Sequence, residues 1–193
     1  MISPQIKNLL LQSLEHERGG VVVFTTALRC AQNADLAKEW QEYLEQTKRH
    51  VQALTTACEA LGLDPEENTP GCAIVHHTGA ALVKVMKMAL EGGDATAAEL
   101  VACECVVLAE TKDHANWELI GECAKNLKGK EAAALKAAYD EVEDEEDEHL
   151  YHTKGWCREL WLKSLGFRAV LPPPEEEKHV KTAIGAARAK NSR

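Results

Sequence analysis

The sequence predicts an all-α protein built as a bundle of four long helices. Alanine and leucine, which favour helix, are abundant, and only 12 glycines and 6 prolines interrupt the 193 residues. Apolar residues recur at alternating steps of three and four along four long stretches, which is the period of helices that bury one face. We find no stretch with the alternation of a strand. Hydrophobic residues make up 45% of the chain, enough for a packed core.

Start and stop signals set the expected helix ends. Asn33 and Asp94 are expected N-caps, and Leu61-Gly62 and Gly166 are expected stops. The four long helices are then expected over residues 4–32, 34–61, 95–127 and 131–165, and a shorter helix over residues 72–91.

The connection between the second and third long helices is much longer than the other two. Short connections make antiparallel neighbours, and a long one permits a crossover. We therefore expect two antiparallel helix pairs joined by a long crossover that carries the short extra helix. This bundle is expected over residues 1–167, followed by a Pro-containing C-terminal tail over residues 168–193. The tail starts with an extended Leu171-Pro172-Pro173-Pro174 segment and ends in either a short basic helix or a loose arm.

The charge and the cysteines limit the partners and the compartment. A net charge of −9 argues against nucleic acid and anionic membranes, because both require a basic face. Apolar runs such as Val21–Phe24 are too short to span a bilayer, and the N-terminus lacks a signal-peptide pattern. Seven cysteines without a CxxC pair are typical of free thiols in a reducing cytoplasm, which is the expected location.

Each of the four long apolar stripes is interrupted near its middle by polar residues. All the interrupting residues except Thr47 are carboxylates or imidazoles. They are Glu17 in the first stripe, Thr47 and His50 in the second, Glu110 and His114 in the third, and Glu146 and His149 in the fourth.

Ionised carboxylates inside a bundle must be neutralised. Burying three of them at one level would be prohibitive without a cation, and carboxylates with imidazoles suit iron, manganese or zinc. Glu146 and His149 form a Glu-x-x-His pair, which a helix presents on one face, one turn apart. If the register slips by one residue, Glu145 and His152 are the alternative pair.

With these motifs the chain resembles the ferritin-like superfamily of non-haem di-iron and di-manganese carboxylate proteins over residues 8–165. That family takes one Glu from each of two helices and Glu-x-x-His from each of the other two. The resemblance implies a metal centre, with two ions favoured over one, held by Glu17, His50, Glu110, Glu146 and His149. Thr47 departs from the pattern, because the family has Glu at that place. His114, one turn after Glu110, could supply the missing ligand, and Asp113 is a candidate partner for a ligand histidine.

The resemblance further implies an oxidoreductase that acts on peroxide or dioxygen, and a possible homodimer. Two alternatives stay open at this point. The first is a non-catalytic metal-binding or stress-related bundle, which includes a zinc site. The second is a metal-free helical scaffold in which the buried acids pair with His50, His114 and nearby Arg or Lys.

Overall fold

The computed structural model describes residues 2–193, in which the regular structure consists of seven helices without strands. The prediction of an all-α bundle is confirmed. Within these residues, no helix has both the length and the apolar character that crossing a membrane requires. The helices are α1 (Pro4–Cys30), α2 (Ala34–Ala60), α3 (Pro70–Glu91), α4 (Ala95–Asn126), α5 (Gly129–Ser164), α6 (Pro174–Glu177) and α7 (Ala183–Lys190).

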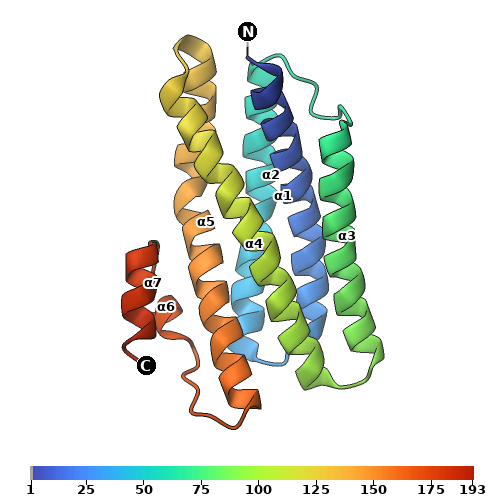
Figure 1. Cartoon of the computed structure of the whole chain (residues 1–193), viewed down its shortest axis with the longest axis vertical. Helices are drawn as coiled ribbons and strands as arrows, with labels where there is room; N and C mark the ends of the chain where they lie inside the picture. The colour runs from blue at the N-terminus through green and yellow to red at the C-terminus, as the bar shows by residue number, and fades with distance from the viewer. Residues whose placement is uncertain (1) are drawn as a thin grey trace.

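Two helix hairpins form the body of the molecule (Figure 1). The antiparallel pair α1 and α2 packs beside the antiparallel pair α4 and α5, with α1 against α4 and α2 against α5. The connection from α2 to α4 contains α3, which lies along the outside of α1 and α4. The long helices therefore enclose a common interior to which four of them, α1, α2, α4 and α5, contribute.

The expected caps are observed, and two helices start earlier than expected. Asn33 Oδ1 accepts from the backbone N–H groups of two residues in the first turn of α2, and Asp94 Oδ1 accepts from Ala97 N at 3.0 Å. Helix α3 starts two residues before its predicted start, because Thr69 Oγ1 accepts from Cys72 N. Helix α5 also starts two residues early, at Gly129, whose positive φ of 69° lets the chain turn from α4 with only two intervening residues.

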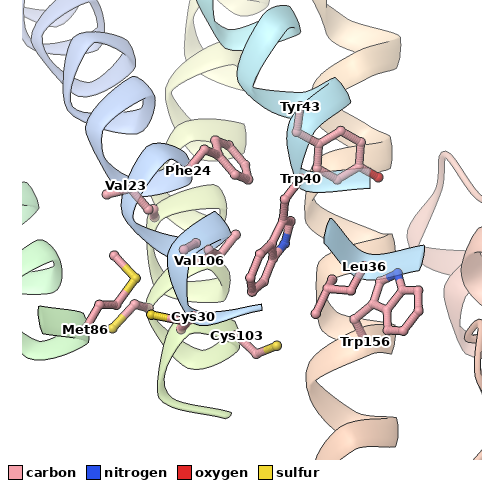
Figure 2. Close-up of a cluster of buried hydrophobic side chains, with 14 of the residues drawn as sticks. Val23, Phe24, Cys30, Leu36, Trp40, Tyr43, Met86, Cys103, Val106 and Trp156 are labelled. Carbon is pink, nitrogen blue, oxygen red and sulfur yellow. The ribbon is translucent and has the colours of Figure 1, made fainter. Parts of the chain in front are cut away.

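The apolar core is divided into two parts along the bundle. One part surrounds Phe24, Trp40, Tyr43 and Trp156 near the turn between α1 and α2 (Figure 2). The other part, toward the opposite end, is built from apolar residues of all five long helices, namely Leu10, Leu11, Leu14, Ala53, Leu54, Ala57, Cys58, Cys72, Trp117, Ile120, Leu135, Ala138 and Val142. The polar residues that interrupt the stripes lie between these two parts in the sequence of each helix.

The C-terminal tail folds back onto α5 rather than hanging free (Figure 1). Arg158 on α5 forms a two-pronged ion pair with Glu175, through Nη1 and Oε1 at 2.7 Å and Nη2 and Oε2 at 2.8 Å. The tail approaches α5 closely at Gly155, where a Cβ atom would lie 2.7 Å from Glu175 Oε2 and 3.0 Å from Pro173 Cβ. The short helix expected near the C-terminus is α7.

Gly155→Ala is expected to release the tail without unfolding the bundle. The added methyl group collides with Glu175 and Pro173, whereas alanine itself favours the helical backbone of α5. Limited proteolysis should cut the tail of this variant faster, with an unchanged helical circular dichroism signal. The matched control is Gly79→Ala in α3, where nothing lies within 4 Å of the new Cβ. Equal tail protection in the two variants would contradict this packing.

Candidate metal centre

A layer of buried polar side chains separates the two parts of the apolar core. Its members come from four helices: Glu17 from α1, His50 from α2, Glu110 from α4, and Glu146 and His149 from α5. Their exposed fractions are 0%, 1%, 2%, 2% and 0%, respectively. These side chains face inward, as the interrupted stripes predict.

The five side chains form two groups that share Glu146. In the first group, His50 Nδ1 lies 2.8 Å from Glu146 Oε1 and 3.6 Å from Glu17 Oε1. In the second group, His149 Nδ1 lies 3.2 Å from Glu110 Oε2 and 3.7 Å from Glu146 Oε1. Within each group, one oxygen or nitrogen atom per residue lies within 4.8 Å of the others, so each group could hold a metal ion.

The opposite edge of each imidazole is held by a neighbouring side chain. His50 Nε2 lies 2.8 Å from Glu145 Oε2, and Arg49 binds the other oxygen of Glu145 at 2.7 Å. His149 Nε2 lies 2.6 Å from Gln46 Oε1. Contacts of this kind orient ligand histidines, because a hydrogen on Nε2 leaves the Nδ1 lone pair free for a cation.

Several atoms in the layer are buried without a hydrogen-bond partner. Among the described residues they include both carboxylate oxygens of Glu146, Oε2 of Glu17 and Nδ1 of His50. The other oxygen of Glu17 accepts from Trp117 Nε1 at 2.7 Å. Unpaired buried polar atoms cost free energy, and a cation bound by one atom of each residue in a group would supply a partner to such atoms. The side chains present therefore fit a metal ion.

Burial shifts the ionisation of the layer. Desolvation raises the pKa of Glu110 to about 7 and raises the pKa values of Glu17 and Glu146 well above the ordinary range, with further increases from neighbouring carboxylates for the last two. Desolvation and then the charge of His50 lower the pKa of His149 to about 3, so this imidazole is neutral at neutral pH. Without a cation the carboxylates therefore hold protons, and metal binding must release them.

Two residues expected near the centre, His114 and Thr47, have other partners. His114 lies outside both groups, and its Nε2 contacts Asp147 Oδ1 at 2.8 Å. This contact with Asp147, on the neighbouring α5, engages His114 outside the two groups. Thr47 is buried, and its hydroxyl donates to the backbone carbonyl of Tyr43 at 2.8 Å.

The alternative pair, Glu145 and His152, is not at the centre. Glu145 is partly exposed and binds His50 from outside, as described above. His152 belongs to a second buried network, in which its Nδ1 lies 3.2 Å from Glu39 Oε1 and 3.1 Å from the hydroxyl of Tyr43. The register with Glu146 and His149 inside is the one that the structure has.

Asp113 is a buried acid of the layer that the stripes did not select as a ligand. It is almost fully buried, its Oδ1 has no hydrogen-bond partner, and its Oδ2 lies 4.0 Å from His16 Nε2. Its charge raises the pKa values of Glu17 and Glu146, which places it within electrostatic range of the first group. The sequence signal was its spacing, because Glu110 and Asp113 are three residues apart, like Glu146 and His149.

The second network supports the layer from one side. Trp156 Nε1 and the hydroxyl of Tyr43 both donate to the carboxylate of Glu39. The Tyr43 ring packs against His149, with ring centroids 4.1 Å apart. The apolar stripe did not select Glu39, because the stripe passes through Trp40 and Glu39 lies one position before it. Its contacts fix Tyr43, and thereby one face of the His149 ring.

Comparisons of the chain with protein-family models, with curated proteins and with solved structures find no match. The interpretation of the layer therefore depends on its own geometry and on the chemistry of its side chains.

The affinity for a divalent cation is expected to rise with pH around neutrality. Below the Glu110 pKa of about 7 this carboxyl group is protonated and cannot bind a metal, and above that value it is ionised. Each proton that must leave makes the affinity fall about tenfold per pH unit below the pKa. Titration with Co²⁺, followed by its visible absorption, measures this slope. In Glu110→Gln the affinity should depend less steeply on pH than in the parent. Equal slopes in the two proteins would show that Glu110 does not bind the metal.

Proposed function

We propose that this chain binds two metal ions in the buried layer, with Glu17, His50 and Glu146 at one ion and Glu110, His149 and Glu146 at the other. The observation that carries this proposal is that the two groups share Glu146, whose buried Oε1 lies 2.8 Å from His50 Nδ1 and 3.7 Å from His149 Nδ1. A carboxylate with two oxygens can bridge two cations.

The hydrogen bonds of His50 support a cation at the first group. Hydrogen bonds and charges from His50 and Arg49, acting against desolvation, lower the pKa of Glu145 to about 2, so Glu145 accepts and does not donate. His50 Nε2 donates to Glu145, and His50 Nδ1 faces Glu146 Oε1 at 2.8 Å. Against desolvation, the carboxylates of Glu145, Glu17 and Asp113 raise the pKa of His50, so without a metal ion a proton lies between these two atoms. Two lone pairs at that distance repel each other, and either a proton or a metal ion between them removes the repulsion.

The helix arrangement supports assignment to the ferritin-like proteins. Two hairpins, α1 with α2 and α4 with α5, lie side by side, and α3 lies in the long connection between them. A single Glu on α1 and on α4, and Glu-x-x-His on α5, follow the ligand pattern of di-iron and di-manganese bundles. We therefore propose iron or manganese as the metal.

Bound iron or manganese would supply the electron transfer that reduces dioxygen or disproportionates peroxide, and we propose an oxidoreductase of this kind. The residues of the chain would provide the rest of the site. Gln46 and Glu145 orient the two histidines, and Trp117 holds one oxygen of Glu17. The two apolar parts of the core exclude water on both sides of the layer, which strengthens every charge interaction within it.

Thr47 favours a second candidate, a non-catalytic metal-binding bundle. The Thr47 hydroxyl is engaged with the backbone of α2, so α2 contributes only His50 to the layer. A centre with fewer carboxylates has fewer ligands available to change coordination during a reaction. In this case the ions would stabilise the fold or be stored.

Metal content decides between these proposals and a metal-free scaffold. Elemental analysis of protein grown with added iron and manganese should find about two ions per chain, one for each of the two groups. The double variant Glu146→Ala, His149→Ala should lose most of the metal, because Glu146 belongs to both groups and His149 to one. Asp140→Ala, Glu141→Ala, in exposed residues of the same helix, is the matched control and should retain it.

The other outcomes are equally informative. About one ion per chain would support a mononuclear or storage site. Metal-free parent protein whose thermal stability is unaffected by added metal would refute the metal centre. With metal bound, turnover of peroxide or dioxygen by the parent, and its loss in the double variant, separates the oxidoreductase from the non-catalytic bundle.

A further inference from the structure

A cavity of about 270 Å³ lies between α4, α5 and the segment that leads into α7. Its lining includes Trp117 and Glu118 from α4, Glu143, Glu146 and Asp147 from α5, and Lys181 from the tail. The cavity thus extends from the tail to Glu146, which both metal groups share.

Glu146 is the group that connects this cavity to the buried layer. It is 2% exposed, it lines the cavity, and both of its oxygens lack a hydrogen-bond partner. Trp117, which donates to Glu17, lines the same cavity. An ion in the cavity would therefore meet Glu146 first and the rest of the layer afterwards.

The charges around the cavity favour a cation. Four carboxylates line it, from Glu118, Glu143, Glu146 and Asp147, and Lys181 is the one lysine or arginine among the described lining residues. His114, which also lines the cavity, contacts Asp147 at 2.8 Å. A concave site of one sign of charge concentrates ions of the opposite sign and speeds their association.

Lys181 lines the cavity from the tail and also contacts acids of α5 beside it. Its Nζ lies 3.1 Å from Asp144 Oδ2 and 3.3 Å from Glu148 Oε1, both on α5. It neutralises part of the acidic run with a positive charge that is attached to the tail. The next residues, Thr182 and Ala183, complete the lining on the tail side.

We infer that this cavity is the route by which divalent cations reach the buried layer, and that Lys181 restricts entry by adding a positive charge to the lining. The inference rests on the proposed function, because a route requires a metal centre at its inner end. The outer carboxylates would bind an arriving ion weakly and pass it to Glu146. The cation class is a small divalent ion, since oxygen ligands dominate the lining.

The rate of metal loading tests this route separately from the metal centre itself. Full-length protein is stripped with a chelator and mixed with Co²⁺ at low ionic strength. Stopped-flow absorption gives the loading rate, and elemental analysis gives the final metal content. The double variant Glu143→Gln, Asp147→Asn should load at least about tenfold more slowly and reach the same final content, because it weakens the attraction and leaves the ligands intact.

The matched control is Asp140→Asn, Glu141→Gln. It changes the net charge equally, on exposed residues of the same helix that do not line the cavity, and should load like the parent. Lys181→Gln should load faster than the parent, since it removes a positive charge from the lining of the cavity. Added salt should reduce the difference between the parent and the slow variant.

Each other result has a distinct meaning. Equal rates in the two double variants, with normal final metal content, would refute the route and leave the metal centre standing. A lower final content in Glu143→Gln, Asp147→Asn would mean that these acids are ligands, and would also refute the route. Slower loading in Lys181→Gln would refute its restricting role. A parent that binds no Co²⁺ at equilibrium would instead refute the proposed metal centre.

Discussion

Neutralising the charges of one buried polar layer is the constraint on which the rest of this structure depends. Buried carboxylates and imidazoles from four helices meet between two apolar parts of the core. Burying several like charges together is far more costly than any single helix contact gains. The layer therefore requires protons or cations, and the raised pKa values of Glu17, Glu110 and Glu146 show how strongly the bundle favours neutralisation.

The acidic run at residues 143–148 is divided by the helical period among different tasks. Glu146 points into the layer, while Glu145 reaches His50 from the outer side. Asp147 contacts His114, and Asp144 and Glu148 contact Lys181 of the tail. The acids of this run therefore make several separate interactions and do not form one solvated face. The reason is that successive residues of a helix point in directions about 100° apart.

The two helix pairs are related but not equivalent in the layer. The position three residues after Glu17 is Gly20, whereas the position three residues after Glu110 is Asp113. Gly20 lies against Thr47, and a Cβ added to it would lie 3.1 Å from Thr47 Cγ2. Helices α1 and α2 thus approach closely at Gly20 and Thr47, and α4 carries an additional buried acid, Asp113. The acidic groups are unevenly distributed between the two pairs.

The sequence by itself determined the all-α class and the helix caps at Asn33 and Asp94, because helical periodicity and local capping act within one segment. It also predicted the five side chains of the layer, with Glu145 and His152 left open as the alternative pair. It did not determine the place of His114, the burial of Asp113 and Glu39, or the contact of the tail with α5. Those depend on which residues of other helices lie opposite: Asp147 for His114, Tyr43, His152 and Trp156 for Glu39, and Gly155 and Arg158 for Glu175. Periodicity indicates which face of a helix turns inward, and only the packed structure decides which residues of other helices that face contacts.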